Sequence, residues 1–238
     1  RILVSSNNAK KDCLKFYKID PKKIYVAPFS IDLNPKNHLN KKDYLKDKYN
    51  IQNEFFYIPN QFWQHKNHLI IFNFLDKIQE NKKIYKKIPE FIFTGLSFDN
   101  RNKKFSNLIL EKMRSKKYAD KVKYLGLVPL EDVYTLNANC VALINPSFFE
   151  GWSTTVEEAK SLGTKMILSN IELHKEQAKE AMFFDPKKIE SFQDIILKFI
   201  SNQGELSNYR DLNQIQKYSE IRKIEYSEAI HNAFKFES

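Results

Sequence analysis

The sequence has only two cysteines, Cys13 and Cys140, in 238 residues. They form no Cys-x-x-Cys pair and show no metal-ligand spacing. These absences argue against a disulfide-stabilised secreted domain and against a zinc module, and they are typical of a reduced, intracellular protein. The chain also lacks an apolar run of the roughly 18–20 residues that a transmembrane helix needs. We therefore expect a cytoplasmic protein, and a contact with the inner face of the membrane stays open.

The sequence is poor in glycine, with five in total, and it lacks the glycine-rich motifs that bind phosphates. It contains no Gly-x-Gly-x-x-Gly and no Gly-Lys-Ser/Thr, which argues against dinucleotide oxidoreductases and P-loop enzymes. Among the five histidines, His65 and His68 lie three residues apart at an expected helix start. No third ligand accompanies them, so we expect no zinc site. His65 would either line a loop or be exposed at the helix start.

Positive charge is in excess. The 39 lysines and arginines against 29 aspartates and glutamates give a formal net charge of +10. This imbalance raises nucleic acids, anionic lipids and phosphorylated substrates as partners. The lysine pairs are scattered over several expected helices and loops, whereas a nucleic-acid-binding surface usually gathers them on one element. We therefore expect no nucleic-acid partner, although a few lysines would suit peripheral contact with an anionic membrane.

Short apolar runs alternate with amphipathic stretches from about residue 54 onward. Runs of this length, rich in branched and aromatic side chains, are typical of strands buried on both faces. The expected strands span residues 55–58, 91–94, 122–125, 140–144, 165–168 and 182–184. Because helical patterns lie between these runs, the sequence predicts an α/β fold with a Rossmann-like, doubly wound parallel sheet.

Residues 54–186 form the expected α/β core, and the segments on either side differ from it. Residues 1–53 contain two short expected strands, a helix and a polar connection. Residues 187–238 contain two expected helices, 189–201 and 205–235. The second helix is amphipathic, with Tyr218, Ile221, Ile224, Ile230 and Phe234 as its apolar residues. The chain opens at Arg1, without a Met and already inside a strand-like run, so we expect it to be a piece of a longer protein.

The most informative segment is 145–159, Asn-Pro-Ser-Phe-Phe-Glu-Gly-Trp-Ser-Thr-Thr-Val-Glu-Glu-Ala. It follows an expected strand and leads into a helix, and ligands of open parallel sheets collect beyond the carboxyl ends of the strands. The N–H groups at the helix start form an anion site, and Gly151 lets the backbone approach a ligand closely. Glu150 and Glu158 would then reach different hydroxyls of one ligand. This combination suits a sugar joined to a phosphate.

The same glutamates have structural alternatives. Thr154 and Glu157 fit a capping box, which would give Glu157 a purely structural role. Glu158 alone could be a solvated helix residue, since glutamate is common on helix surfaces. The framing by Pro-Ser, Glu-Gly and Glu-Ala, after a buried strand and before Gly163, favours the ligand-binding interpretation.

Residues 145–163 resemble the Glu-x7-Glu signature of the retaining GT-B glycosyltransferases that are often called group 1 or family 4. Residues 28–32, Pro-Phe-Ser-Ile-Asp, resemble the family's Asn-Gly-Ile-Asp turn. Residues 59–67, Pro-Asn-Gln-Phe-Trp-Gln-His-Lys-Asn, resemble its phosphate loop, and residues 125–128 resemble its base-binding turn. The resemblance implies that residues 1–238 are a single nucleotide-sugar-binding lobe of a GT-B fold, with the N-terminal acceptor lobe absent from this chain.

The resemblance also implies roles for individual residues. Glu150 would contact the donor sugar and be needed for turnover, and Glu158 would bind the ribose hydroxyls of the nucleotide. The other implied donor-binding residues are Gly151, Trp152, Ser153 and Thr154 at the sugar and diphosphate, and Leu127 and Val128 at the base. The family is metal-independent and uses no cofactor besides its nucleoside-diphosphate sugar substrate, and this chain has no Asp-x-Asp.

Lys66 is the candidate catalytic cation. Without a metal, a leaving diphosphate needs a cation and oriented N–H groups, and a lysine at the mouth of a helix can reach a phosphate as a flexible point charge. A lone lysine in a basic protein is usually solvated, and the loop context favours function here. The family commonly has an arginine five residues earlier, where this chain has Gln61. One positive charge is therefore missing, and Gln61 or Trp63 could contact the phosphates in its place.

The resemblance implies the donor-binding lobe of a retaining glycosyltransferase that acts in surface polysaccharide or glycolipid synthesis. The intact enzyme would move a sugar to an acceptor hydroxyl of a glycan or a lipid-linked saccharide, and this chain alone would turn over little. The alternatives are a non-catalytic nucleotide-sugar-binding module, a GT-B-type sugar-nucleotide epimerase, and a nucleic-acid-binding domain suggested by the charge alone. The donor base, the sugar, the acceptor and the oligomeric state stay open.

Overall fold

A six-stranded sheet forms the centre of the molecule. The computed structural model describes residues 1–202 and 211–235, and all six strands run parallel, in the order β5-β4-β3-β6-β7-β8. The strands are β3 Phe55–Ile58, β4 Glu90–Phe93, β5 Val122–Tyr124, β6 Ala142–Asn145, β7 Met166–Ser169 and β8 Met182–Phe184. The predicted doubly wound α/β fold is confirmed, with strand ends shifted by a residue or two.

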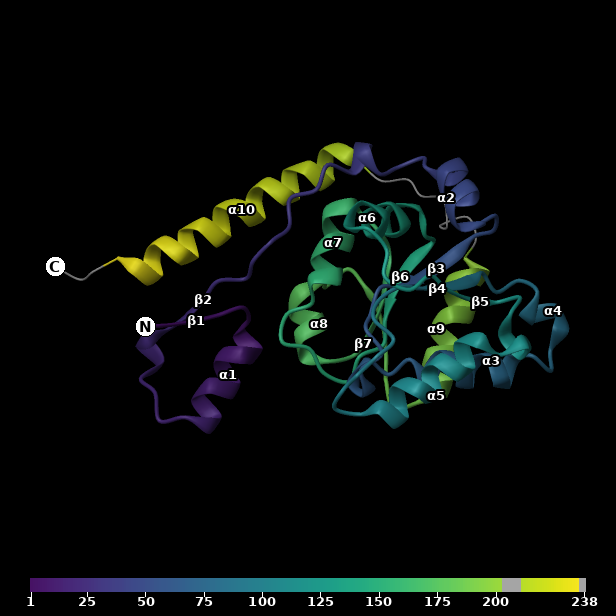
Figure 1. Ribbon diagram of the computed structural model, residues 1–238. Helices are drawn as coiled ribbons and strands as arrows, with labels where there is room; N and C mark the ends of the chain where they lie inside the picture. Colours follow the sequence, from purple (N-terminus) through teal and green to yellow (C-terminus); the bar gives the residue numbers. More distant parts are fainter. Residues whose placement is uncertain (203–210, 236–238) are drawn as a thin grey trace.

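Helices cover both faces of this sheet (Figure 1). One face carries α3, α5 and α9, and the other carries α6, α7 and α8. The helices around the sheet are α2 Lys42–Tyr49, α3 Leu69–Ile78, α4 Lys82–Tyr85, α5 Lys103–Arg114, α6 Leu130–Asn139, α7 Thr154–Leu162, α8 Glu172–Gln177 and α9 Ile189–Ser201. The single-turn 3-10 helices are η1 Pro21–Lys23, η2 Pro35–Asn37, η3 Gln64–Lys66 and η4 Lys116–Tyr118.

Strand β3 shows why the apolar runs became buried strands. All four of its side chains are buried, and they alternate between the two faces of the sheet. Phe56 and Ile58 pack into the large core beneath α3 and α9, whereas Phe55 and Tyr57 pack toward α2 and α6. A strand with helices on both faces has no solvent-facing side, so its sequence is apolar throughout.

The strand order reverses between β3 and β6. The chain runs outward from β3 through β4 to β5, and then from β6 through β7 to β8 on the other side. In open α/β sheets the crevice beyond the carboxyl ends of the strands at such a switch point is the usual ligand site. The loops that follow β3 and β6 are joined there, because the Phe148 amide donates to the His65 carbonyl at 2.7 Å.

The first part of the chain forms a small sheet of its own. Strands β1, Ile2–Val4, and β2, Ile24–Val26, pair in parallel, and α1, Asn7–Phe16, connects them. These elements confirm the expected strand–helix–strand pattern. Among the described residues they pair only with each other and not with the six-stranded sheet. How the chain divides into lobes stays a prediction.

The last helix, α10, spans Leu212–Phe234 and crosses the outside of α7 to reach β2 (Figure 1). Residues 205–210 of the expected helix lie outside the described residues. Four of the apolar residues of this amphipathic helix, Tyr218, Ile221, Ile224 and Phe234, are exposed. The helix is instead fixed by Arg222, whose guanidinium donates to Glu157 of α7 at 2.7 Å. None of the helices in residues 1–202 and 211–235 is long and apolar enough to cross a membrane.

Candidate functional site

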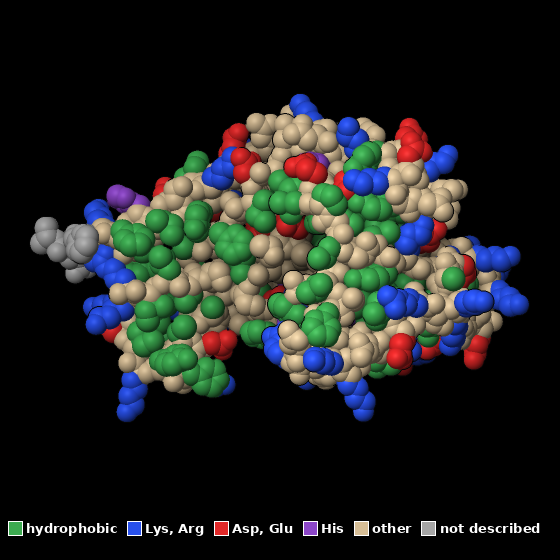
Figure 2. Space-filling view, in the orientation of Figure 1, with side chains coloured by type: hydrophobic (Ala, Val, Ile, Leu, Met, Phe, Trp, Pro, Cys, Tyr) green, Lys and Arg blue, Asp and Glu red, His purple; other side chains and the backbone are tan. Residues whose placement is uncertain are grey.

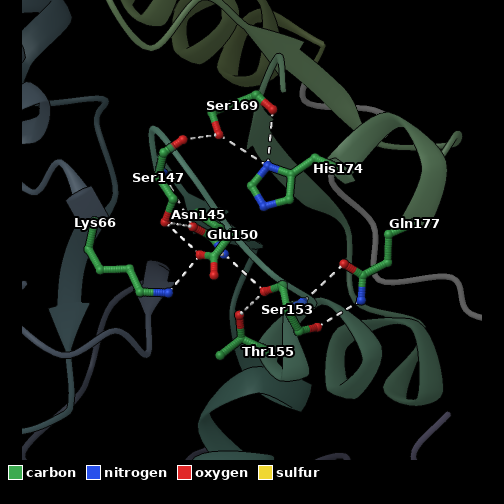
Figure 3. Close-up of polar contacts among 9 residues, drawn as sticks. All are labelled: Lys66, Asn145, Ser147, Glu150, Ser153, Thr155, Ser169, His174 and Gln177. Carbon is green, nitrogen blue, oxygen red and sulfur yellow. Dashed lines mark hydrogen bonds and ion pairs between the residues drawn. The ribbon is translucent and has the colours of Figure 1, made fainter. Parts of the chain in front are cut away.

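Lys66 and Glu150, the two predicted catalytic residues, meet at the switch point of the sheet. Lys66 ends η3 in the loop after β3, and Glu150 lies in the loop after β6. Their Nζ and Oε1 atoms are 2.6 Å apart, and the two side chains are only 13% and 7% exposed. Figure 3 shows the ammonium pointing at the carboxylate across the gap between the two loops. A buried ion pair of this kind is expensive to desolvate, so other polar groups must support it.

The support comes from the end of β6 and from the loop after it that carries Glu150. The Ser147 hydroxyl donates to Glu150 Oε1 at 2.7 Å, and the Asn145 amide approaches the same oxygen at 3.3 Å. Burial alone would raise the pKa of Glu150, but the Lys66 ammonium and the Ser147 hydroxyl hold that pKa below its ordinary value. Within the described part of the chain, these hydrogen bonds all end on Oε1. The second oxygen, Oε2, is therefore left to accept from a ligand.

Asn145 and Ser147 were not among the predicted site residues. Asn145 is fully buried at the end of β6, and its amide also donates to the Ser153 hydroxyl at 3.1 Å. The Ser147 amide in turn donates to the Asn145 side chain at 3.3 Å. A polar residue that closes an otherwise apolar strand is a signal that could have identified Asn145. Buried polar side chains are kept only where they find partners.

His174 of α8 was also missed. It is fully buried, and its Nδ1 lies 3.0 Å from the carbonyl oxygen and 3.1 Å from the hydroxyl of Ser169. The Ser169 hydroxyl donates to the Ser147 carbonyl at 2.5 Å. The imidazole is thus linked through Ser169 to the loop that carries Glu150 (Figure 3). The sequence offered no signal for this link, because it depends on β6 and β7 lying side by side.

Helix α7 begins at Thr154 without a side-chain cap. The Ser153 hydroxyl at its N-cap contacts Asn145 and Thr155 instead of the amides of the first turn. The capping box of Thr154 and Glu157 is therefore wrong. Glu157 points away from the cap, and its carboxylate accepts hydrogen bonds from Lys160, Gln177 and Arg222. Hydrogen bonds from two charged groups and an amide stabilise the carboxylate more than one hydrogen bond from a backbone N–H would. The uncapped amides suit an anionic ligand.

The other residues of the loop before α7 surround this helix start. Gly151 and Thr154 are exposed, and Ser153 is buried. The Trp152 indole donates to the Phe29 carbonyl at 3.2 Å and packs edge-on against the Phe29 ring. The turn of residues 28–32 is thereby fixed beside the site. A Cβ at position 151 would meet nothing within 4 Å among the described residues, so packing within the fold does not require a glycine there.

Glu158 is buried in α7 with an unsatisfied oxygen. The residue is 8% exposed, and its Oε2 has no hydrogen-bond partner among the described residues. Burial raises the pKa of this carboxyl to about 7. The ring hydroxyls of Tyr57 and Tyr134 lie close enough for Glu158 to raise their pKa values. A buried carboxylate oxygen without a partner would be stabilised by hydrogen bonds from hydroxyl groups, such as those of a ribose.

The loop after β3 is held against the loop after β4. The Phe62 amide donates to the Leu96 carbonyl at 3.1 Å, and Gly95 lies so close that a Cβ there would be 2.9 Å from the Asn60 carbonyl oxygen. Asn67, in a left-handed conformation with φ of 55°, donates its amide to the Pro146 carbonyl at 3.1 Å. These contacts fix the backbone that carries Lys66. The side chain of Gln61 is exposed at the same loop.

Residues 40–218, more than half of the chain, match the family model described as glycosyl transferases group 1. The chain belongs to this family. It is 24% identical over 91% of its length to the O-antigen chain mannosyltransferase RfbU of Salmonella typhimurium. Over 41% of its length it is 31% identical to O-antigen chain mannosyltransferase B of Escherichia coli. The chain covers 55% of the Salmonella protein and 26% of the Escherichia coli protein.

Solved glycosyltransferase structures share this fold. A glycosyltransferase from Rickettsia africae matches 98% of the chain with a TM-score of 0.80 at 18% identity. HepE of Anabaena, solved in complex with UDP-glucose, matches 97% with a TM-score of 0.73 at 13% identity. The chain spans 62% of each of these proteins. The predicted GT-B type of α/β fold is confirmed by these neighbours.

In this group 1 glycosyltransferase chain, the residues expected at the base lie apart from the ion pair. Leu127 is 72% exposed on the turn after β5, and the neighbouring Val128 is half-buried. Strand β5 is separated from β3 by β4. The structure thus brings Lys66, Glu150 and the start of α7 together, and it leaves Leu127 and Val128 at the edge of the sheet.

The histidines beside Lys66 serve packing. His68 is fully buried between Phe62 and Phe93, and burial lowers its pKa to about 3. His65 is half-buried between Trp63 and Phe149, so it lines the loop and is not an exposed helix-start residue. No group of three or more His, Cys, Asp or Glu side chains in the described ranges could hold a metal ion. A metal-independent reaction stays a prediction.

Proposed function

We propose that this chain is the donor-binding lobe of a retaining, metal-independent glycosyltransferase. The enzyme moves a sugar from a nucleoside diphosphate to an acceptor hydroxyl. The observation that carries the proposal is the buried Lys66–Glu150 pair at the switch point, beside the uncapped start of α7. Membership of the group 1 glycosyl transferases supports the reaction class, and the position of the ion pair supports a role in binding the donor.

The diphosphate would lie between Lys66 and the first amides of α7. Bond cleavage at the sugar leaves a developing negative charge on the diphosphate, and a preorganised ammonium with oriented N–H groups stabilises that charge. Lys66 is already held in the crevice by Glu150, so little side-chain entropy is lost when a phosphate replaces the carboxylate as its partner. Gln61 supplies no charge, which leaves Lys66 and the helix as the main phosphate-binding groups.

Oε2 of Glu150, which accepts none of the hydrogen bonds that hold Oε1, and the unsatisfied Oε2 of Glu158 suit the two sugars of the donor. Oε2 of Glu150 would accept from a hydroxyl of the transferred sugar, and Glu158 would accept from the ribose hydroxyls. In the retaining reaction, the anomeric carbon–phosphate oxygen bond breaks while the acceptor oxygen attacks from the same face. The acceptor proton passes to the leaving phosphate oxygen. Lys66 balances the charge on that phosphate throughout the step.

The acceptor would be bound by a lobe that this chain does not contain. The chain covers about half of the Salmonella relative, and the names of both curated relatives concern O-antigen chains. A saccharide acceptor, free or lipid-linked, in polysaccharide biosynthesis is therefore part of the proposal. So is a cytoplasmic location with peripheral contact at an anionic membrane. Because HepE was solved with UDP and with UDP-glucose, uridine nucleotides are the first donors to try.

Isothermal titration calorimetry with UDP, GDP and dTDP tests the site. We expect at least one nucleotide to bind, Lys66→Ala to weaken it about tenfold or more, and Glu158→Ala to weaken it through the ribose. Lys77→Ala is the matched control, because Lys77 is paired with Glu190 at 2.8 Å on the exposed surface. The site assignment is wrong if no nucleotide binds, or if Lys66→Ala and Glu158→Ala behave as the control does.

A second experiment distinguishes the transferase from a non-catalytic binding module. The binding module is the alternative that Gln61 favours, because Gln61 stands where the family commonly has an arginine. The chain is joined to the missing upstream lobe, and release of nucleoside diphosphate from candidate donors is measured. We expect release with one donor and its loss in Glu150→Ala. No release with any donor, in a protein that still binds nucleotide, would favour the binding module.

A further inference from the structure

The imidazole of His174 has one nitrogen in use and one without a partner. Its Nδ1 contacts the Ser169 carbonyl at 3.0 Å, and the buried Nε2 has no hydrogen-bond partner among the described residues. In Figure 3 the second nitrogen points from α8 toward the carboxylate of Glu150. His174 and Glu150 form no direct ion pair or hydrogen bond within the described ranges. The ring therefore faces the site without touching its carboxylate.

The contact at Nδ1 fixes the tautomer. A carbonyl oxygen only accepts hydrogen bonds, so Nδ1 carries the proton and Nε2 presents a lone pair. Burial lowers the pKa of His174, against the opposing effect of Glu150, and this keeps the ring neutral. Two acceptors thus lie at this site, Nε2 of His174 and Oε2 of Glu150. A buried acceptor left without a donor is costly, which points to a donor that arrives with a ligand.

A purely structural role would not explain the second nitrogen. Through Ser169, Nδ1 supports the Ser147 carbonyl and hence the loop of Glu150. That task needs one donor at the Nδ1 position, and an asparagine could supply it. The support of the Ser147 carbonyl gives no reason for a second ring nitrogen, Nε2, in a fully buried position near Glu150.

We propose that His174 is a sugar-binding residue, whose Nε2 accepts a hydrogen bond from one hydroxyl of the donor sugar. Oε2 of Glu150 accepts a hydrogen bond from the adjacent hydroxyl of the same sugar. This inference rests on the proposed function and deepens it. Two adjacent acceptors match two adjacent hydroxyls, since each hydroxyl has one proton to donate. A sugar that lacks the hydroxyl at Nε2 leaves this buried acceptor unsatisfied, and for that reason it is discriminated against. His174 then helps to determine which sugar is transferred.

A pair of isosteric variants separates the two nitrogens. In His174→Asn the amide group replaces Nδ1 and the Nε2 position is removed, whereas His174→Gln places an amide near Nε2 and loses the Ser169 contact. Calorimetry is run with UDP, GDP, UDP-glucose, UDP-N-acetylglucosamine and GDP-mannose, and thermal unfolding is followed for each variant. We expect His174→Asn to bind the free nucleoside diphosphate within twofold of wild type and the matching nucleotide sugar about tenfold more weakly.

Deoxy forms of the sugar that binds then identify the hydroxyl. One of them should bind wild type and His174→Asn equally, because the missing hydroxyl and the missing nitrogen remove the same contact. If His174→Asn binds nucleotide and nucleotide sugar as wild type does, while His174→Gln loses stability, the residue is only structural and the inference is wrong. If wild type binds no nucleoside diphosphate, the proposed function itself has failed.

Discussion

At the scale of single residues, the Lys66–Glu150 pair is held ready for a ligand at a cost in stability. Its two charges are buried, and each depends on the other until a phosphate arrives. Removing one partner of such a pair leaves a buried charge without compensation. Activity and stability should therefore respond differently when one or both charges are removed.

Lys66→Met should lower the free energy of unfolding by about 3–5 kcal/mol at pH 7.5. The double variant Lys66→Met/Glu150→Gln should recover most of that loss, because the stranded carboxylate is gone, and yet it should not recover nucleotide binding. Urea unfolding and calorimetry measure the two effects. Lys77→Met is the control: its partner Glu190 is exposed at a similar distance of 2.8 Å, so it should cost less than about 1 kcal/mol. Equal losses in Lys66→Met and Lys77→Met would contradict the prediction.

Glu158 predicts a pH dependence of stability. Its pKa in the folded protein is about 7, above the ordinary 4.5. Between these values the folded state keeps a proton that the unfolded state releases, so Glu158 lowers stability as the pH rises from 4.5 to 7. In Glu158→Gln this loss is absent. The stability of the variant relative to wild type should therefore increase by about 2 kcal/mol from pH 5 to pH 8.

Urea unfolding at both pH values measures this change in relative stability. Glu172→Gln, at an exposed position of α8, should show no such change with pH. A relative stability of Glu158→Gln that is the same at pH 5 and pH 8 would mean that Glu158 titrates normally in the folded protein.

The sequence was sufficient to place Lys66 and Glu150 in loops after strands and Glu158 in the first turns of a helix, and their roles toward a ligand stay predictions. It was not sufficient for Ser147 and His174. Their roles follow from which loops the sheet brings together, since the Ser169 hydroxyl at the end of β7 joins one to the other. Hydrogen bonds between residues that follow neighbouring strands leave no periodic pattern in the sequence.

At the scale of elements, the strands were predictable and the environment of α10 was not. Strands buried on both faces are apolar at every position, which marks them plainly. The apolar residues of α10 have the spacing of a buried face, but Tyr218, Ile221 and Ile224 are exposed in this chain, and the helix is fixed by Arg222 on Glu157. Periodicity shows that a helix has an apolar side, and it does not show what covers that side.

Two glycines at strand ends offer a test of how the loop that carries Lys66 is positioned. Gly95 has φ of 123°, and a Cβ there would lie 2.9 Å from the Asn60 carbonyl oxygen, whereas Gly126, with φ of 73°, has nothing within 4 Å. Both alanine variants pay a left-handed backbone cost of about 1–2 kcal/mol. Only Gly95→Ala must also displace the backbone of residues 60–61.

Gly95→Ala should therefore weaken nucleotide binding about tenfold or more, and Gly126→Ala should lower stability with binding within about twofold of wild type. Calorimetry and thermal unfolding of the two variants measure this contrast. Equal losses of binding in both would show that the phosphate loop does not depend on its contact with Gly95.

At the scale of the whole molecule, the charge of +10 is spread and not concentrated. Figure 2 shows lysines and arginines scattered around this face with acidic side chains between them. Interactions between exposed charges fade over about 8 Å at physiological salt. The distribution therefore gives a ligand in the crevice Lys66 as a buried cation, with Arg101 over the Trp63 ring of the same loop, and a weak background from scattered surface charges.

This distribution predicts that nucleotide affinity is insensitive to distant surface charge. Lys82 and Lys83 are exposed in α4, at the far end of α3 from the phosphate loop, and the ten residues of α3 span about 15 Å. The double variant Lys82→Glu/Lys83→Glu reverses two charges, and it should bind the preferred nucleoside diphosphate within about twofold of wild type at physiological salt. Lys66→Ala removes one charge and should lose far more. If the double variant weakens binding as much as Lys66→Ala does, the field of the whole protein attracts the nucleotide, and the local ion pair does not explain it.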